Sequence, residues 1–107
     1  HVSPWGSVYK LHLLTHHALT FVLTSGGHNA GIVSEPGHAG RHYRCATRDP
    51  GAAYRSRHDF VRDTPAVDGS WWTCWRDWLH ARSSGDVPAR TPAAGFAAAP
   101  GTYVLET

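Results

Sequence analysis

The chain has 107 residues, the size of one small domain or of a piece of a larger one. Ten basic residues against eight acidic ones give a formal charge of +2, too balanced for the clustered basic face of a nucleic-acid-binding protein. No apolar run approaches the ~20 residues that a membrane-spanning helix needs. The sequence contains no methionine, so we expect part of a longer protein.

The first predicted unit is a helix followed by a strand. Ser3-Pro4 is typical of a helix start, with a hydroxyl at the cap and proline at the first helical position. Apolar residues at helical spacing extend this helix over residues 3–14, and a β-branched run predicts a strand over 19–25. A helix that leads directly into a strand predicts an αβ unit of a parallel sheet.

His28 follows this strand directly after two glycines. The glycines let the chain turn sharply, so the histidine is presented at the carboxyl end of the strand, where open α/β sheets place their chemistry. In α/β-hydrolases the base comes after the nucleophile and the acid in chain order. His28 is therefore a candidate general base, and a solvated turn residue is the alternative. Backbone roles in holding the loop are expected for its neighbours Gly26, Gly27, Asn29 and Gly31.

The middle of the chain carries weaker signals. Residues 42–46 predict a strand at the edge of a sheet, and residues 59–62 predict one short helical turn. A cluster of Arg41, Arg44 and Arg48 favours a solvated loop, with a contact to a coenzyme phosphate as the alternative.

A tryptophan-rich helix is predicted over residues 70–82. Ser70 is a good N-cap, and Gly85 is a good stop. One helical face carries Trp71, Trp75, Trp78 and Leu79. Aromatic stripes at this spacing usually form core, so we expect the face to pack against the sheet. A ligand cage and an exposed binding face are the alternatives.

The last 25 residues differ in composition from the rest. The chain is accordingly divided into a body, residues 1–82, and a tail rich in Ala, Pro and Gly, residues 83–107. An extended surface tail is expected, in which the apolar residues 101–105 are candidates for docking back on the body.

Two cysteines and two pairs of histidines complete the candidate residues. Cys45 and Cys74 lack metal-ligand spacing and a Gly-x-Cys-x-Gly elbow, so two free, mostly buried thiols in a reducing cytoplasm are expected. Histidines four residues apart, His12/His16 and His38/His42, suggest zinc, but no further ligand completes either pair. No metal site is predicted.

Taken together, the chain resembles the carboxyl-terminal end of class I poly(3-hydroxyalkanoate) synthases over nearly its whole length. The matching segments are His1-Val2-Ser3-Pro4-Trp5, Ser7-Val8-Tyr9-Lys10, Thr20-Phe21-Val22-Leu23, Ser25-Gly26-Gly27-His28-Asn29-Ala30-Gly31-Ile32-Val33, Pro36-Gly37-His38, Gly69-Ser70-Trp71-Trp72, Trp75, Trp78-Leu79 and Ala99-Pro100-Gly101-Thr102-Tyr103-Val104.

The resemblance implies an α/β fold class, the C-terminal fragment of an α/β-hydrolase fold. Its parts are a helix, the last sheet strand, the His loop, the Trp-rich helix and an extended tail. It also implies a Cys–Asp–His catalytic set of which only His28 lies in this chain. The aspartate precedes the residue that matches His1, which makes His1 a possible neighbour of the site, and the cysteine lies further upstream.

The implied activity is polymerisation of (R)-3-hydroxyacyl-coenzyme A thioesters into a polyester, with release of coenzyme A. Coenzyme A enters only as part of the substrate, so no separate cofactor is implied. The resemblance further implies a homodimer, at the surface of cytoplasmic polyester granules. The isolated fragment is expected to be inactive. An esterase or polyester depolymerase of the same fold, and a non-catalytic module that binds granules or proteins, are the alternatives.

Overall fold

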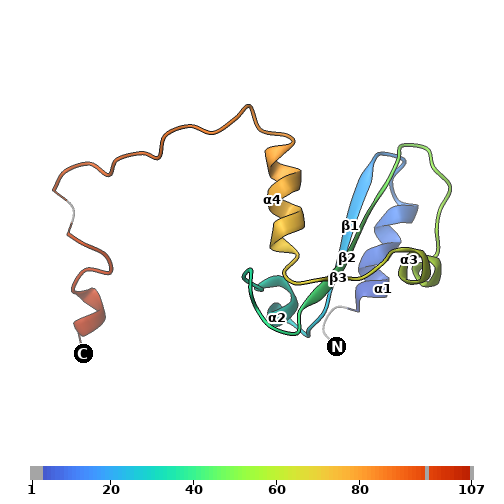
Figure 1. Ribbon diagram of the computed structural model, residues 1–107, viewed down its shortest axis with the longest axis horizontal. Helices are drawn as coiled ribbons and strands as arrows, with labels where there is room; N and C mark the ends of the chain where they lie inside the picture. The colour runs from blue at the N-terminus through green and yellow to red at the C-terminus, as the bar shows by residue number, and fades with distance from the viewer. Residues whose placement is uncertain (1–3, 96, 107) are drawn as a thin grey trace.

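The structure is a computed structural model that describes residues 4–95 and 97–106. Short helices alternate with three strands, and a long segment without helix or strand leads away from the body (Figure 1). In chain order the elements are α1 (Trp5–Val8), the 3-10 helix η1 (Tyr9–Leu13), β1 (Leu19–Thr24), α2 (Asn29–Ile32), β2 (His42–Arg48), α3 (Arg57–Asp63), β3 (Val67–Asp68), α4 (Trp72–His80) and the 3-10 helix η2 (Tyr103–Leu105).

The three strands form one antiparallel sheet in the order β1-β2-β3. β1 pairs with β2 from Leu19 opposite Arg48 to Thr24 opposite Tyr43. The predicted parallel αβ unit is therefore wrong for the pairing within this chain. A parallel return needs a long crossover, usually a helix, and the connection from β1 to β2 contains only the four-residue α2. Among the described residues, β1 is an edge strand.

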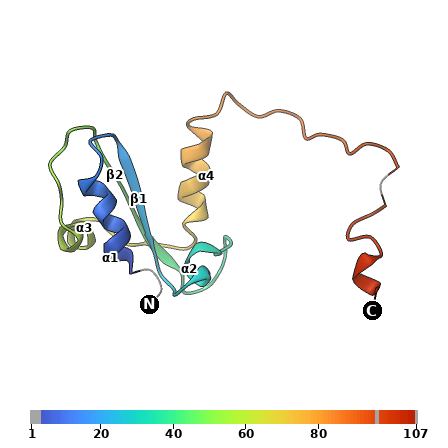
Figure 2. The same ribbon diagram turned by 180° about the vertical axis from the view of Figure 1, so that it is seen from behind.

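Helices lie on both sides of this sheet. Two views from opposite sides show α1 and α3 against one face and α4 beside the other (Figures 1 and 2). On the first face the rings of Tyr9, Phe21 and Phe60 pack within 5.0–5.5 Å of one another. Tyr9 and Phe60 are almost completely buried, so this cluster is the centre of the core. The predicted first helix is confirmed as α1 and η1; its proposed cap, Ser3, lies outside the described residues.

Arginines of β2 hold the ends of two helical segments. Arg48 donates hydrogen bonds to the carbonyl groups of His12 and Thr15 at the end of η1. Arg44 donates to the carbonyl of Thr64, the residue after α3. Carbonyl groups at helix ends have no partner inside the helix, and these guanidinium groups supply one. Arg44 and Arg48 are therefore neither residues of a solvated loop nor an anion site. The predicted strand over residues 42–46 is confirmed as β2, which extends to Arg48.

The helix α3 is the predicted turn over 59–62, lengthened at both ends. Ser56 caps it: its hydroxyl accepts a hydrogen bond from the backbone N–H of Asp59 and donates to Oδ2 of the same residue. This hydrogen bond, together with nearby Arg62, lowers the pKa of Asp59. The reciprocal contact fixes the start of α3, which places Phe60 in the core.

The tryptophan-rich helix forms, but its apolar face is not core. The N-cap position is Trp71 rather than the predicted Ser70, but the Ser70 hydroxyl accepts a hydrogen bond from the backbone N–H of Trp72, the first helical residue. Trp75, Trp78 and Leu79 are 48%, 41% and 42% exposed, so the expectation that this face is buried against the sheet is wrong for this chain. A groove of about 590 Å³ separates most of α4 from the strands.

The tail agrees with one part of its prediction and differs from another. Described residues from 83 to 102 form no helix or strand, which confirms an extended segment. Tyr103 and Leu105 in η2 are 72% and 77% exposed, and η2 lies away from the body (Figure 1), so residues 101–105 do not dock back on it. No helix in the described part of the chain has the length and apolar character needed to cross a bilayer.

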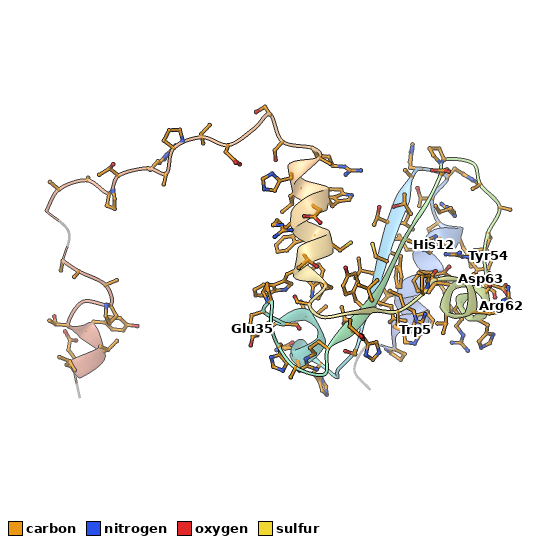
Figure 3. All side chains as sticks on the ribbon, viewed as in Figure 1. Trp5, His12, Glu35, Tyr54, Arg62 and Asp63 are labelled. Atoms are coloured by element: carbon orange, nitrogen blue, oxygen red, sulfur yellow. The ribbon has the colours of Figure 1, made fainter. Side chains whose placement is uncertain are left out.

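The pH dependence of folding should depend on His12. This side chain is 7% exposed and packs against Tyr9 on the side of the sheet opposite α4 (Figure 3). Burial first, and then the charges of Arg48 and Arg55, lower its pKa below the ordinary 6.5. The unfolded chain therefore binds a proton that the folded chain excludes, so the stabilisation is complete above about pH 6.5 and falls as the pH drops towards the folded pKa.

Thermal unfolding of the chain between pH 7.5 and pH 5 tests this. We expect the wild type to lose up to about 1.4 kcal/mol of stability per pH unit through this group, and His12→Gln to lose less. The exposed His16→Gln variant is the control and should keep the wild-type slope. Equal slopes in wild type and His12→Gln would contradict the assignment.

Candidate active-site loop

The loop that carries His28 begins where β1 is still firmly paired. Ser25 makes two hydrogen bonds to His42 at the start of β2: its N–H donates to the carbonyl (2.9 Å), and its hydroxyl accepts from the N–H (3.0 Å). These bonds fix the chain up to the point where the glycines begin. His28 follows three residues later, so its backbone is placed by the end of the sheet.

His28 lies between the strand and α2 in an unusual backbone conformation. Its φ of 48° and ψ of −134° make it the one non-glycine residue with positive φ among residues 4–95 and 97–106. The residue is exposed rather than packed in hydrocarbon, and its ring makes no hydrogen bond to another described residue. Residues in sparsely populated backbone regions persist only where their surroundings hold them, and they cluster at functional sites.

The glycines of the loop have different roles. A Cβ on Gly31 would lie 2.6 Å from Oγ1 of Thr24 and 3.2 Å from the carbonyl oxygen of Ser25, so α2 packs against the strand end only because this side chain is missing. Gly26 has a φ of 103° and also lies against the Arg41 guanidinium. Around Gly27, by contrast, a Cβ would meet nothing within 4 Å. Close packing thus requires Gly26 and Gly31, but not Gly27.

The far end of the loop is held by the residues that start α4. Both indole N–H groups of Trp71 and Trp72 donate to the carbonyl oxygen of Ile32, at 2.9 and 2.8 Å. Ser70 donates its hydroxyl hydrogen to the carbonyl of Ser34. The sequence analysis considered the tryptophans as core, as a ligand cage or as a binding face, and it missed this hydrogen-bonding role. The signal available was the run Ser70-Trp71-Trp72, three adjacent donors directly before the helix.

The remaining predicted site residues fall into three groups. Asn29 is the first residue of α2 and is exposed; its side chain makes no hydrogen bond within the described part of the chain. His1 lies outside the described residues. Of the arginine cluster, only Arg41 lies beside the loop, and its Nε is buried without a partner. Arg41 is therefore the member of that cluster that lies beside the loop and keeps a guanidinium N–H without a partner among the described residues.

The zinc alternative gains no further ligands from the structure. His38 Nδ1 lies 2.9 Å from Oε1 of the exposed Glu35 in the loop after α2 (Figure 3). This hydrogen bond from His38 lowers the pKa of Glu35. No group of three or more His, Cys, Asp or Glu side chains with metal-binding geometry occurs in residues 4–95 and 97–106.

Comparison with known proteins gives relatives over almost all of the chain. It is 35% identical to the Poly(3-hydroxyalkanoate) polymerase 2 of Ectopseudomonas oleovorans over 114 aligned residues, covering 98% of this chain and 19% of that protein. It is 35% identical to the Poly(3-hydroxyalkanoate) polymerase of Methylorubrum extorquens, covering 97% and 17%, and 32% identical to the polymerase subunit PhaC of Cupriavidus necator, covering 97% and 18%. No family model and no solved structure matches.

The fold and the relatives together define the class of the protein. It is a small mixed α/β unit with a three-stranded antiparallel sheet, and its relatives imply a region of α/β-hydrolase type. The chain is homologous to the poly(3-hydroxyalkanoate) polymerases, and it spans less than a fifth of the length of the curated relatives it matches.

Two glycine substitutions test the packing of the loop. Gly31→Ala should destabilise the chain by about 1–3 kcal/mol, because its Cβ would overlap Thr24 and the backbone of Ser25. Gly27→Ala is the matched control and should stay within about 0.5 kcal/mol of the wild type. Thermal or denaturant unfolding measures both. Equal effects would mean that α2 does not pack on the end of β1 as described.

A second test removes the indole donors. Trp71→Phe combined with Trp72→Phe keeps aromatic rings but leaves the Ile32 carbonyl without either partner. We expect amide hydrogen exchange in residues 29–34 to speed up by about tenfold, the equivalent of a typical net hydrogen bond. Trp78→Phe, whose ring stacks with Arg82, is the control and should leave this segment unchanged. Unchanged exchange in the double variant would show that the carbonyl contact does not hold the loop.

Proposed function

We propose that this chain supplies the general base of a polyester-forming acyl transferase, and that His28 is that base. The single observation that carries the proposal is the placement of an exposed histidine, in a held and strained loop, directly after a sheet strand. Homology to the poly(3-hydroxyalkanoate) polymerases over 97–98% of the chain supports it.

The chemistry follows from the properties of imidazole. With an unperturbed pKa of about 6.5, an imidazole accepts and returns protons near neutral pH. His28 would take the proton of a cysteine thiol supplied by polypeptide outside these 107 residues, and an aspartate from outside them would orient the ring. The thiolate attacks the thioester carbonyl, coenzyme A leaves, and an acyl-enzyme remains. The hydroxyl group of another unit then attacks the acyl-enzyme and extends the polyester.

The proposal also covers the substrate class, the oligomeric state and the cellular location of the protein. The substrate class is (R)-3-hydroxyacyl-coenzyme A, with coenzyme A as the leaving group rather than a resident cofactor. The working protein is a homodimer at the surface of cytoplasmic polyester granules, and the chain alone is inactive because the proposed cysteine and aspartate lie outside these 107 residues. Residues 1–82 belong to the α/β-hydrolase catalytic domain, and residues 83–107 form its tail.

One observation favours a second role for α4. Trp75, Trp78 and Leu79 are each more than 40% exposed on one helix, which is the outcome expected of a binding face rather than of a core helix. A granule surface is apolar enough to cover such a face.

The alternative that the protein is a hydrolase, either an esterase or a polyester depolymerase, differs from the proposal in the nucleophile. A serine nucleophile would favour hydrolysis, and a cysteine nucleophile would favour polymerisation.

A chimera, in which a known polymerase subunit supplies the rest of the enzyme, tests the role of His28. The matching segment of the Cupriavidus necator polymerase subunit is replaced by this chain, and polymer formation and coenzyme A release from 3-hydroxybutyryl-coenzyme A are measured. We expect His28→Ala to lower the rate by about 10²–10⁴-fold, the contribution typical of a general base. The matched control is His58→Ala, an exposed histidine on α3 far along the chain, which should retain the parental rate.

Circular dichroism and thermal unfolding of the same variants separate lost chemistry from lost folding. Near-parental activity in a folded His28→Ala chimera would remove His28 from the mechanism. A folded parental chimera without activity would argue against the proposed function as a whole.

A further inference from the structure

The two cysteines of this chain, far apart in sequence, meet in the fold. Cys45 lies in β2 and Cys74 lies in α4, 29 positions later. Their Sγ atoms are 3.0 Å apart, and both are free thiols. A disulfide bond is about 2.05 Å long, so the sulfurs would need to approach by only about 1 Å to become bonded.

The sheet register explains why they meet. Cys45 is paired with Val22, and Val22 lines the groove between β1 and α4. Cys74 lines the same groove from the helix side. The two thiols thus form a direct contact between α4 and β2, while the apolar residues further along the helix stay exposed. The groove gives small solutes a path to Cys74.

We propose that Cys45 and Cys74 form a reversible disulfide that clasps α4 to the sheet. No residue of the proposed catalytic loop takes part, so the inference goes beyond the proposed function and does not rest on it. The oxidant is a low-molecular-weight disulfide of the oxidised glutathione class, which reaches Cys74 through the groove.

The exchange balances in two steps. The Cys74 thiolate attacks one sulfur of the small disulfide, forming a mixed disulfide and releasing one small thiol. The Cys45 thiolate then attacks Cys74 Sγ, closing the protein disulfide and releasing a second small thiol. Overall, the two protein thiols lose two protons and two electrons, and the small disulfide gains them.

The environment makes Cys74 the first sulfur to react. Burial first, and then contact with the Cys74 thiol, raises the pKa of Cys45 to about 12 in the reduced pair, so little Cys45 thiolate is present at neutral pH. Thiolates are the reacting species. Closure should therefore be slow near pH 7 and faster at pH 8.5, which is a signature of a buried resolving thiol.

The clasp would connect to the loop through the start of α4. Trp71 and Trp72, three and two residues before Cys74, hold the Ile32 carbonyl of the loop. Fixing Cys74 to β2 leaves α4 less freedom to move away from the strands, so oxidation should protect both the helix and this contact.

The experiment uses the intact protein that carries this chain, kept folded in buffer with excess oxidised glutathione. After the free thiols are alkylated, trypsin places Cys45 in residues 45–48 and Cys74 in residues 63–76. We expect a disulfide-linked pair of these two peptides that dithiothreitol releases. Amide exchange in residues 72–80 should slow by about tenfold or more on oxidation.

Single-cysteine variants are the matched controls. In Cys45→Ala, Cys74 should stop at the mixed disulfide with glutathione, and exchange in α4 should not slow. Absence of the linked peptides in folded wild type, or their formation only after denaturation, would overturn the proposal. Linked peptides without slower exchange would show that the bond forms but does not clasp the helix, which also contradicts it.

Discussion

The pairing of β1 with β2 is the constraint on which the rest of the structure depends. Its register turns Phe21 towards Tyr9 and Phe60, and it turns Val22 and Cys45 towards α4. Side chains alternate between the two faces of a strand, so a slip of one residue would exchange these two sets and destroy both layers. The same pairing ends in the two hydrogen bonds between Ser25 and His42, and these determine where the chain leaves the sheet towards His28.

The strained loop is held from both ends. On one side it follows the last paired residue of β1; on the other, three donors from residues 70–72 hold the carbonyls of Ile32 and Ser34. His28, the residue with the positive φ, lies in the short segment between these two fixed ends, and such a conformation persists only where its surroundings hold it. Trp71 and Trp72 are thus positioning residues for the loop, which gives the start of α4 a role independent of how much of the helix is buried.

Local features of this fold could be predicted from the sequence, whereas its long-range pairings could not. The strand, the glycines and the histidine after them are adjacent in sequence, and so are Ser70 and the start of the helix that its hydroxyl contacts, so local rules suffice. The direction of pairing between β1 and β2, the meeting of Cys45 with Cys74, and the contacts of Arg44 and Arg48 with distant carbonyls all depend on register. Spacing in the sequence carries no information about residues that come together only through the sheet.

The tryptophan face of α4 is exposed because the core of this chain is small. Only Tyr9, Tyr43 and Phe60 are buried apolar side chains among the described residues, too few for a chain of this length to cover both faces of its sheet. A helix with four aromatic and aliphatic side chains on one stripe gains stability only where something covers that stripe. Under the proposed function, this chain corresponds to less than a fifth of a polymerase. The edge of β1, which has no strand partner in residues 4–95 and 97–106, and the open face of α4 are then the surfaces on which the remaining fold, or a polyester granule, would pack.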